Sequence, residues 1–350
     1  MIINSLTIKN FRNHEFLTFD FSKGINAITG PNASGKTSVV EAIYYLSLAR
    51  SFRGVNDNEL IRHNAEFPCD ISAKICEGNI NKIIRIIITN GGRRCFVNGK
   101  PITKLKELLD VVNVVLFEPK NVFLFQGQPK DRRNFLDINL AKKSSVYYDY
   151  LLDYEKILKE RNEILKSPKI DETLLETNTE MLVKKAGPIV QFRQMYIKDI
   201  NDILNKITRT LAGENNFVEV NYKPFVPYDN EFEKNAIAAF NKALESDLRH
   251  KSTSIGIQRE DFSISLNGKD IASCGSQGQN RLVAIAIKLA PYFLIKDEDK
   301  RPIVILDDVM SELDQEHRQR LIKFLKKFEQ VFITGTKLTI EDAKIYQIKK

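Results

Sequence analysis

The stretch from residue 25 to residue 43 constrains the fold of this chain more than any other. An apolar run, Ile25–Ile28, ends near a glycine, and a helix-like pattern starts just after Lys36 and Thr37. Between them lies a segment that fits the phosphate-loop pattern G-x-x-x-x-G-K-[ST], formed by Gly30, Pro31, Asn32, Ala33, Ser34, Gly35, Lys36 and Thr37. A strand before this loop and a helix after it predict an α/β fold.

Phosphate chemistry explains the residue types in this loop. Glycines let consecutive backbone N–H groups turn toward one anion, and the N-terminus of the following helix adds partial positive charge. Lys36 can reach the β- and γ-phosphates of a nucleotide, and the Thr37 hydroxyl can ligate Mg²⁺. The alternative is a glycine turn followed by an ordinary lysine. We favour a nucleotide site, because strand and helix stand where it needs them.

A second segment, Pro302–Leu306, reads as a buried strand that ends in two carboxylates, Asp307 and Asp308. A strand of this kind beside a phosphate loop is where a Walker B aspartate is found. We expect Asp307 to hold Mg²⁺, directly or through water, and Asp308 to orient or deprotonate the attacking water. The alternative is a strand that ends in a capping aspartate. Together with Lys36, these residues are the catalytic candidates.

A serine- and glycine-containing loop, Ser273–Arg281, precedes that strand and leads into another helical pattern. A Ser-x-Gly-Gln turn at a helix N-terminus is a second anion-binding device. Because a chain needs only one such loop for its own phosphates, the second suggests a site completed across a dimer. After Asp308, the acidic turn Ser311–Asp314 can contact that partner subunit, and Val331–Thr334 predicts a further buried strand.

The composition is typical of a globular chain without membrane segments. The 350 residues are 43% hydrophobic and 28% charged, and the longest apolar run, around residues 111–117, is too short to cross a membrane. Four cysteines show neither zinc-site nor disulfide-scaffold spacing, so we expect a cytoplasmic protein. The net charge of +8 permits a polyanionic partner, although a solvated basic surface explains it equally well.

The remaining chain divides into strand-rich and helical parts. Strands are expected within residues 2–21 and 70–102, with Asn-Gly hairpin turns at 98–99 and 267–268. From about residue 140 to 211 the pattern indicates two packed helices, the second kinked or split at Gly187-Pro188. Residues 217–228 are expected to be an irregular link, followed by a helix over 232–248. Arg12, in a polar turn, can touch a phosphate or face solvent.

Six arginines in basic turns are candidates for contacts with a nucleic-acid backbone, which would give shape preference rather than base readout. A solvated surface is the competing interpretation for each turn. These residues are Arg50, Arg53, Arg93, Arg94, Arg132 and Arg133.

In combination, the motifs resemble the ABC-type ATPase heads of the SMC and DNA-repair proteins, and within them the bacterial recombination mediators. The resemblance spans nearly the whole chain. It is carried by Ile8–Asn13, Gly30–Thr37, Ala49–Arg53, Phe117–Pro119, Arg132–Asp137, Thr253–Gly256, Ser276–Arg281 and Leu306–Asp314.

The resemblance implies an ABC-type head with a mixed β-sheet and an antiparallel β subdomain, interrupted by an inserted helical arm. The expected head segments are 1–130 and 249–350, and the arm is 131–248. The implied function is an ATP- and Mg²⁺-dependent mediator of DNA repair, replication and recombination. Such proteins dimerise head to tail on gapped or duplex DNA, hydrolyse ATP slowly with DNA stimulation, and help load RecA with RecO and RecR. Ser276, Gly278 and Gln279 would contact the nucleotide of the other subunit.

Several positions depart from the family's pattern. Ala33 replaces a common glycine, and Gln258 stands where a histidine is expected. Asp308 and Thr334 replace the glutamate and histidine of transporter-type ATPases, which suits weak turnover. No glutamine follows Phe117 until Gln126, so no Q-loop residue is assigned. The competing classes are a motor or transport ATPase whose turnover is the output, and an ATPase-coupled nuclease, for which no further acidic cluster is evident.

Overall fold

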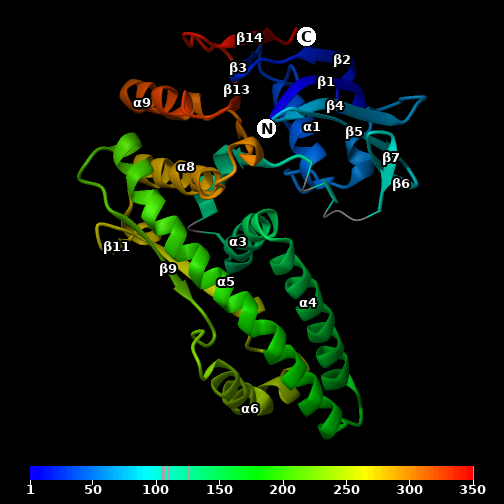
Figure 1. The fold of residues 1–350 in the computed structure, drawn as a ribbon, viewed down its shortest axis with the longest axis vertical. Coiled ribbons are helices and arrows are strands. Elements are labelled where there is room, and N and C mark those ends of the chain that lie inside the picture. Colours follow the sequence, from blue (N-terminus) through cyan, green and yellow to red (C-terminus); the bar gives the residue numbers. More distant parts are fainter. Residues whose placement is uncertain (104–106, 109–110, 125–126, 350) are drawn as a thin grey trace. The chain divides into compact units, whose positions relative to one another are not determined.

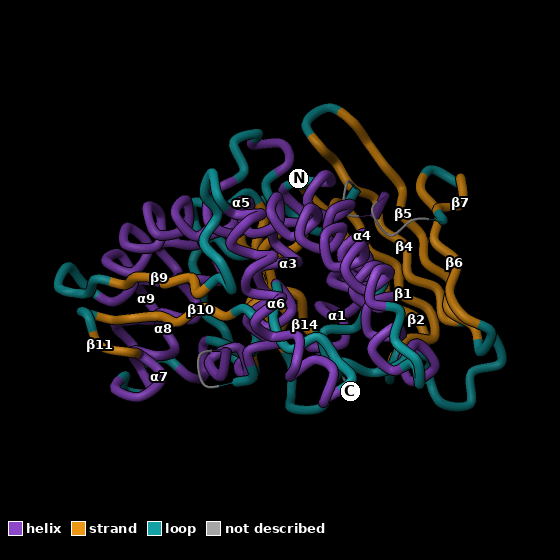
Figure 2. Tube along the Cα trace, turned by 90° about the horizontal axis from the view of Figure 1, so that it is seen from below, coloured by secondary structure: helices purple, strands orange, loops and turns teal. Residues whose placement is uncertain are grey.

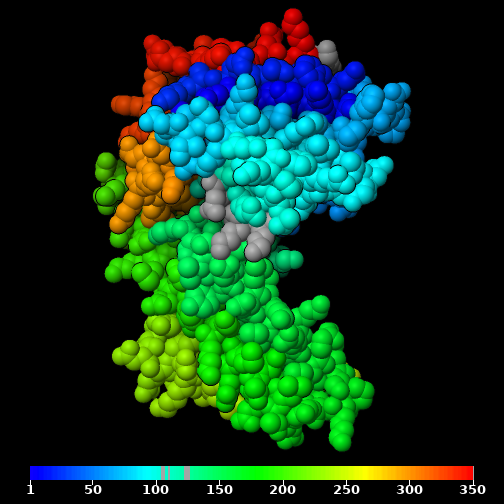
Figure 3. Space-filling view, turned by 45° about the vertical axis from the view of Figure 1, so that its right-hand side comes forward, coloured from blue at the N-terminus to red at the C-terminus, as the bar shows by residue number. Residues whose placement is uncertain are grey.

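The computed structural model describes residues 1–103, 107–108, 111–124 and 127–349. The chain folds into two compact units. The first unit contains Met1–Val122, Ile207–Glu214 and Arg281–Lys350, and the second contains Phe123–Lys206 and Asn215–Asn280. Figure 3 shows the blue N-terminal part and the red C-terminal part gathered in the first unit.

A five-stranded parallel sheet forms the centre of the first unit, in the order β14-β3-β13-β12-β8. Four of its strands, β3, β8, β12 and β13, are almost wholly buried and rich in β-branched residues, as expected for a parallel sheet that is covered on both faces, whereas the edge strand β14 is mostly exposed. Their bounds are β3 Gly24–Thr29, β8 Val114–Phe117, β12 Ile303–Leu306, β13 Gln330–Gly335 and β14 Lys344–Gln347. The strands from the two chain ends therefore become neighbours (Figure 1).

A six-stranded antiparallel sheet, in the order β2-β1-β4-β5-β6-β7, completes the β structure of the first unit. Helix α1 (Lys36–Leu48) contacts strands of both sheets, and its side chains Val39, Val40 and Ile43 lie in the core they share. The strands are β1 Ile2–Phe11, β2 His14–Asp20, β4 Cys69–Glu77, β5 Ile80–Thr89, β6 Gly92–Val97 and β7 Lys100–Ile102. The predicted α/β fold class, with an antiparallel β subdomain and helical segments, is confirmed, and the sheet that was expected to be mixed is parallel in its five strands.

Helices α3 to α6 and a small sheet form most of the described part of the second unit. The helices are α3 Pro129–Lys143, α4 Ser145–Lys166, α5 Glu172–Ala212 (whose last turns belong to the first unit) and α6 Phe232–His250. Figure 1 shows α4 and α5 side by side, with α6 against one end of the pair. The sheet is antiparallel, with β10 (Asp261–Leu266) lying between β9 (Val218–Lys223) and β11 (Lys269–Asp270) (Figure 2).

Short helices and the C-terminal helices complete the chain. They are α7 Ile271–Cys274, α8 Gln277–Leu294, α9 Gln315–Leu325 and the 3-10 turns Asp57–Leu60, Pro119–Leu124, Ile257–Arg259, Glu298–Lys300 and Met310–Glu312. Among the described residues, no helix is both long and apolar enough to cross a membrane. The predicted division into 1–130, 131–248 and 249–350 stays a prediction. By compactness alone, residues 249–280 group with the helical unit, where β10 pairs with β9.

Three local expectations are corrected. Residues 218–223 of the expected irregular link form strand β9, which pairs with β10 along its whole length. Helix α5 is not split at Gly187-Pro188, because it continues through Pro188 as one helix from Glu172 to Ala212; a kink at this point stays a prediction. Strand β14, which the sequence did not indicate, pairs with β3 as an edge strand.

Both Asn-Gly hairpin turns are confirmed. Asn98 and Gly99 have φ of 49° and 78°, and Asn267 and Gly268 have φ of 52° and 77°. Two consecutive positive φ values are the geometry of a type I′ turn, which matches the twist of the flanking strands.

Candidate nucleotide site

The phosphate loop links β3 to α1, the order that the pattern predicts. Gly35 is the N-cap of α1 with φ of 93°, and a Cβ atom there would lie 2.2 Å from Nε2 of His14. His14 Nε2 lies 3.1 Å from the carbonyl oxygen of Gly35, so a side chain of β2 contacts the end of the phosphate loop. Ala33 also has a left-handed backbone, with φ of 63°. A glycine would adopt that conformation without strain.

The two functional side chains at the end of the loop have different partners. Lys36 Nζ donates to the carbonyl oxygens of Gly30 at 2.9 Å and Pro31 at 2.8 Å, which keeps the ammonium group over the loop. Thr37 Oγ1 donates to Asp307 Oδ1 at 3.1 Å. The structure therefore brings the predicted loop and the predicted carboxylate together in the first unit.

Besides Thr37, two neighbouring strands of the parallel sheet, β13 and β8, supply groups that hold Asp307. Thr334 Oγ1, at the end of β13, donates to Asp307 Oδ1 at 2.6 Å, and the Asp307 N–H donates to the carbonyl oxygen of Phe117 at 2.9 Å. Burial raises the pKa of the Asp307 carboxyl, while the hydroxyls of Thr334 and Thr37 oppose the shift. Oxygen donors of this kind suit a hard divalent cation.

Asp308 adopts a left-handed backbone with φ of 50°, which turns the chain sharply after β12. Its N–H donates to Thr334 Oγ1 at 2.9 Å, and its exposed carboxylate accepts from Ser311 Oγ at 3.2 Å. The same threonine hydroxyl thus orients both members of the aspartate pair. A carboxylate fixed in this way next to the metal-type site can accept a proton from water.

The turn Ser276–Gln279, which we call the signature turn, begins α8 with two reciprocal hydrogen bonds. Gln279 N–H donates to Ser276 Oγ at 3.2 Å, and Ser276 N–H donates to Gln279 Oε1 at 3.0 Å. This capping box explains both residue types locally. Gly278 is exposed, and a Cβ atom there would meet no atom of the described chain within 4 Å. The subunit itself therefore supplies no steric reason for a glycine at this position.

The acidic turn after Asp308 is tied to α8 within the first unit. Arg281 pairs with the Glu312 carboxylate and also donates to its carbonyl oxygen. Asp314 caps α9 by accepting the His317 N–H at 2.9 Å. Ser276, Gly278 and Gln279 belong to the second unit and the phosphate loop to the first.

The candidate DNA-contacting arginines differ in the hydrogen bonds and ion pairs that they form within this chain. Arg132 makes a two-pronged pair with Asp261, at 2.7 and 2.9 Å, and Arg133 donates to the Glu260 carbonyl oxygen at 2.8 Å. Arg93 pairs with Asp57 at 2.8 Å, and Arg53 lies 3.7 Å from Glu41. Arg50 and Arg94 are exposed. Contact with DNA stays a prediction for all six residues.

Sequence reasoning missed the partner of Arg12. Its guanidinium does not simply face solvent, because it pairs with the fully buried Glu41 of α1 through bonds of 2.9 and 2.6 Å; contact with a phosphate stays a prediction. Ser51 Oγ, in the basic turn after α1, donates to the same carboxylate at 2.5 Å. The available signal was a glutamate inside an otherwise apolar helix face. Gln126, the nearest glutamine for a Q-loop, lies outside the described residues.

Fold and site together define a class: the first unit is an SMC-type head with the α/β fold of the ABC ATPases. Residues 2–348 match the RecF/RecN/SMC N-terminal domain family. The Smc head domain of Pyrococcus furiosus shares this fold, with a TM-score of 0.57 at 17% identity over 96% of this chain and 89% of that one.

Within this class, the similarity to one group of proteins covers the full length. The DNA replication and repair protein RecF of Oenococcus oeni is 36% identical over 369 residues, covering 100% of this chain and 98% of that protein. RecF of Clostridium tetani is 35% identical over 363 residues, with coverage of 100% and 98%. This chain belongs to the RecF family.

A solved RecF structure is also similar to this chain in its three-dimensional fold. It is described as the recombination mediator protein RecF-ATP in the RecFOR pathway. Its TM-score with this chain is 0.89 at 30% sequence identity, over 99% of this chain and 95% of that one.

Proposed function

We propose that this protein is an ATP-switched DNA clamp that mediates recombination in DNA repair and replication. ATP binding drives head-to-tail dimerisation on gapped or duplex DNA, and slow hydrolysis resets the dimer. The observation that carries the proposal is the exposed turn Ser276–Gln279, whose Gly278 has open space around it in its own subunit. Family membership and the solved RecF-ATP structure support ATP as the nucleotide.

In this proposal the phosphate loop, Gly30–Thr37, binds the triphosphate through its backbone N–H groups. Lys36 leaves the carbonyl oxygens of Gly30 and Pro31 for the β- and γ-phosphates. Thr37 and Asp307 fit Mg²⁺, because a hydroxyl and a carboxylate oxygen lie 3.1 Å apart at the end of the loop. The metal, when bound, would neutralise charge on the phosphates.

The partner subunit supplies the rest of the pocket. Ser276 and Gly278 contact the γ-phosphate in trans, and Gln279 holds the turn through its bond to the Ser276 N–H. A ligand shifts an equilibrium only by its differential affinity for the two states. ATP that spans two subunits supplies such a difference, since only the dimer offers both halves of the pocket.

Hydrolysis serves as a switch rather than as the output. Asp308 is the proposed base, oriented by Ser311 and Thr334. An aspartate is one methylene shorter than glutamate, and threonine stands near the position of the transporters' switch histidine. Both features suit a weak ATPase that DNA stimulates.

DNA contacts are assigned to the basic turns, with Arg50 and Arg94 first because their side chains are exposed. Arg132 and Arg133 would have to exchange or share their present acceptors. Each phosphate contact removed should lower the slope of log affinity against log salt by about 0.9 for duplex DNA. Arg94→Ala measured by fluorescence anisotropy between 50 and 200 mM salt tests this; an unchanged slope removes Arg94 from the interface.

The direct test of the clamp is the molar mass in solution with saturating ATP and Mg²⁺. Wild type should move from monomer to dimer, and Lys36→Arg and Ser276→Arg should each stay monomeric. Lys36→Arg removes a phosphate ligand, whereas Ser276→Arg places a large cation where the partner's phosphate must fit. Wild-type monomers at saturating ATP would refute the proposal.

The alternative is a motor or transport ATPase whose turnover is the output. The inserted helices and the basic turns favour the clamp instead. ATPase rates with and without DNA separate the two, since fast turnover independent of DNA would favour the motor class.

The wider setting of the proposal follows from the family. The solved relative is described as acting in the RecFOR pathway, so we extend RecO and RecR to this chain as partners in RecA loading in the cytoplasm. We also propose that residues 1–130 and 249–350 form the head domain and 131–248 the inserted arm.

A further inference from the structure

A pocket in the second unit lies apart from every residue assigned above. Its volume is about 390 Å³, and helices α5 and α6 form most of its wall. The apolar part of the wall includes Leu175, Ile237, Phe240 and Leu244. Ligand sites commonly range from roughly 300 to 1,000 Å³ and combine apolar walls with a few convergent polar groups.

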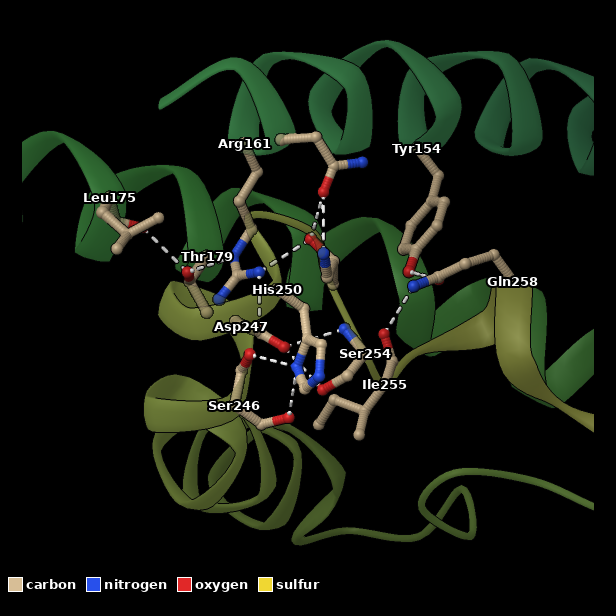
Figure 4. Close-up of polar contacts among 12 residues, drawn as sticks. Tyr154, Arg161, Leu175, Thr179, Ser246, Asp247, His250, Ser254, Ile255 and Gln258 are labelled. Carbon is tan, nitrogen blue, oxygen red and sulfur yellow. Dashed lines mark hydrogen bonds and ion pairs between the residues drawn. The ribbon is translucent and has the colours of Figure 1, made fainter. Parts of the chain in front are cut away.

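The convergent polar group is Arg161 of α4, whose side chain is 1% exposed. Its Nε donates to Thr179 Oγ1 at 2.9 Å, and its Nη1 donates to Asp247 Oδ2 at 2.8 Å and Thr253 Oγ1 at 2.7 Å (Figure 4). The described residues offer Nη2 no acceptor. Because Arg161 lines the pocket, Nη2 is the donor left for a bound group.

The position of Arg161 is fixed rather than adaptable. Its guanidinium carbon lies 5.2 Å from the centroid of the Phe240 ring, and Asp247 is itself held by the N–H and hydroxyl of Ser254. A ligand oxygen at Nη2 would give this nitrogen a charge-assisted hydrogen bond, so the geometry favours a ligand that carries a carbonyl.

Negative charge at the edge of the pocket favours a ligand that carries positive charge. Glu172, Glu176 and Glu180 are exposed pocket residues at four-residue spacing along α5. Residues four apart share a helix face, so the row extends over about 12 Å. In an extended peptide, two side chains four residues apart point the same way and are separated by about 13 Å.

We propose that this pocket binds an extended basic segment of a protein partner. One apolar side chain enters between α5 and α6, the segment's main-chain carbonyl accepts from Arg161 Nη2, and flanking lysines or arginines pair with the glutamates of α5. Acidic segments are excluded because they would face three carboxylates.

A model peptide tests the site in the full-length protein. The probe is the acetylated and amidated heptapeptide AKALAKA, which places a leucine between two lysines on one face. Isoleucine methyl NMR monitors Ile170 and Ile237, both in the pocket wall, and arginine ¹⁵N labelling monitors the guanidinium of Arg161. Saturable shifts of both isoleucine methyls and of the Arg161 Nη signals are expected, with half-saturation near or below about 1 mM.

Matched variants separate this site from non-specific binding of a cationic peptide. Glu176→Lys should weaken binding about tenfold, which is roughly 1.4 kcal/mol, whereas Glu219→Lys, the same charge change on exposed β9, should leave it unchanged. Leu244→Trp should block the pocket. Should that variant misfold, Glu176→Lys decides, because its side chain is exposed.

Three results would overturn the proposal: no saturation at several times the expected concentration, equal shifts from the acidic peptide AEALAEA, or equal binding by Glu176→Lys and wild type. ATP-dependent dimerisation is measured on the same samples, so the outcome is independent of the clamp.

Discussion

The hydroxyl of Thr37 donates to Oδ1 of Asp307 over 3.1 Å, although the two residues are 270 positions apart in the chain. Strands β3 and β12 are separated in the sheet only by β13, whose Thr334 donates to the same oxygen. The bond thus connects the phosphate loop to the aspartate pair from the other end of the chain.

Removing the Asp307 charge should selectively weaken nucleotide binding in the presence of Mg²⁺. Asp307→Asn keeps the shape of the side chain but lowers its affinity for a divalent cation. We expect the affinity for Mg²⁺-ATP to fall by about 10- to 100-fold, the scale seen when metal sites lose a supporting group. Isothermal titration with Mg²⁺ and with EDTA measures the effect. An equal loss under both conditions would contradict a metal role.

Asp308→Asn should separate hydrolysis from the switch. The variant loses the proposed base, so the rate of hydrolysis should fall by roughly 10²- to 10⁴-fold. ATP-driven dimerisation should persist, because the phosphate ligands are intact. Ser311→Ala, which removes the bonds from its hydroxyl to the carboxylate and to the carbonyl oxygen of Asp308, serves as the milder comparison. Full activity of Asp308→Asn would transfer the base role to another group.

The left-handed backbone of Ala33 predicts a stabilising substitution. Its φ of 63° strains a residue with a Cβ, whereas glycine adopts this φ without strain. Glycine also increases the conformational entropy of the unfolded chain, which offsets part of the gain in stability. Ala33→Gly should therefore raise the free energy of unfolding by up to about 1 kcal/mol. Ala238→Gly, at an exposed position inside α6, should lower it by about 1 kcal/mol. Urea unfolding of both variants checks the opposite signs.

Lys288 predicts a pH dependence of stability. Burial lowers its pKa from 10.5 to about 8, with the nearby Glu118 opposing the shift. Between these values the unfolded chain binds more protons than the folded one, so this lysine's contribution to the free energy of unfolding rises with pH from about 8 to about 10.5. Lys288→Met should stabilise the protein at pH 7 by on the order of 2 kcal/mol, and the gain should shrink as pH rises.

The control for this experiment is Lys337→Met, at an exposed position. Its stability difference from wild type should stay small at every pH. A gain from Lys288→Met that grows above pH 8 would show that the lysine does not lose its proton in the folded state.

Local chemistry was readable from the sequence where a residue pattern fixes geometry. The phosphate loop, the Asn-Gly turns and the apolar strand before Asp307 each fall where expected, because their backbone requirements are met by a few adjacent residues. Strand β9 was not predictable in this way. Its six residues precede Pro224, and they become a strand only by pairing with β10, about 40 residues later.

Contacts between residues that are distant in sequence were also not predicted. Arg12 has no local signal for its bond to Glu41, and β14 is a short, mostly exposed strand defined by its contact with β3. The Arg12–Glu41 bond and the β14–β3 pairing both form only when separate segments come together in the fold. No motif within either segment predicts such a contact. The roles of Ser276 and Gly278 are a further case, because their proposed partner is another molecule.

The most direct test of the central claim is a mixing experiment with two inactive variants. Lys36→Arg and Ser276→Arg are each predicted to stay monomeric with ATP. In a head-to-tail heterodimer of the two, one pocket combines the intact phosphate loop of one subunit with the intact signature turn of the other. Mixing should therefore restore ATP-dependent dimers and part of the ATPase activity. A mixture that stays monomeric and inactive, while each variant remains folded, would contradict a pocket shared between subunits.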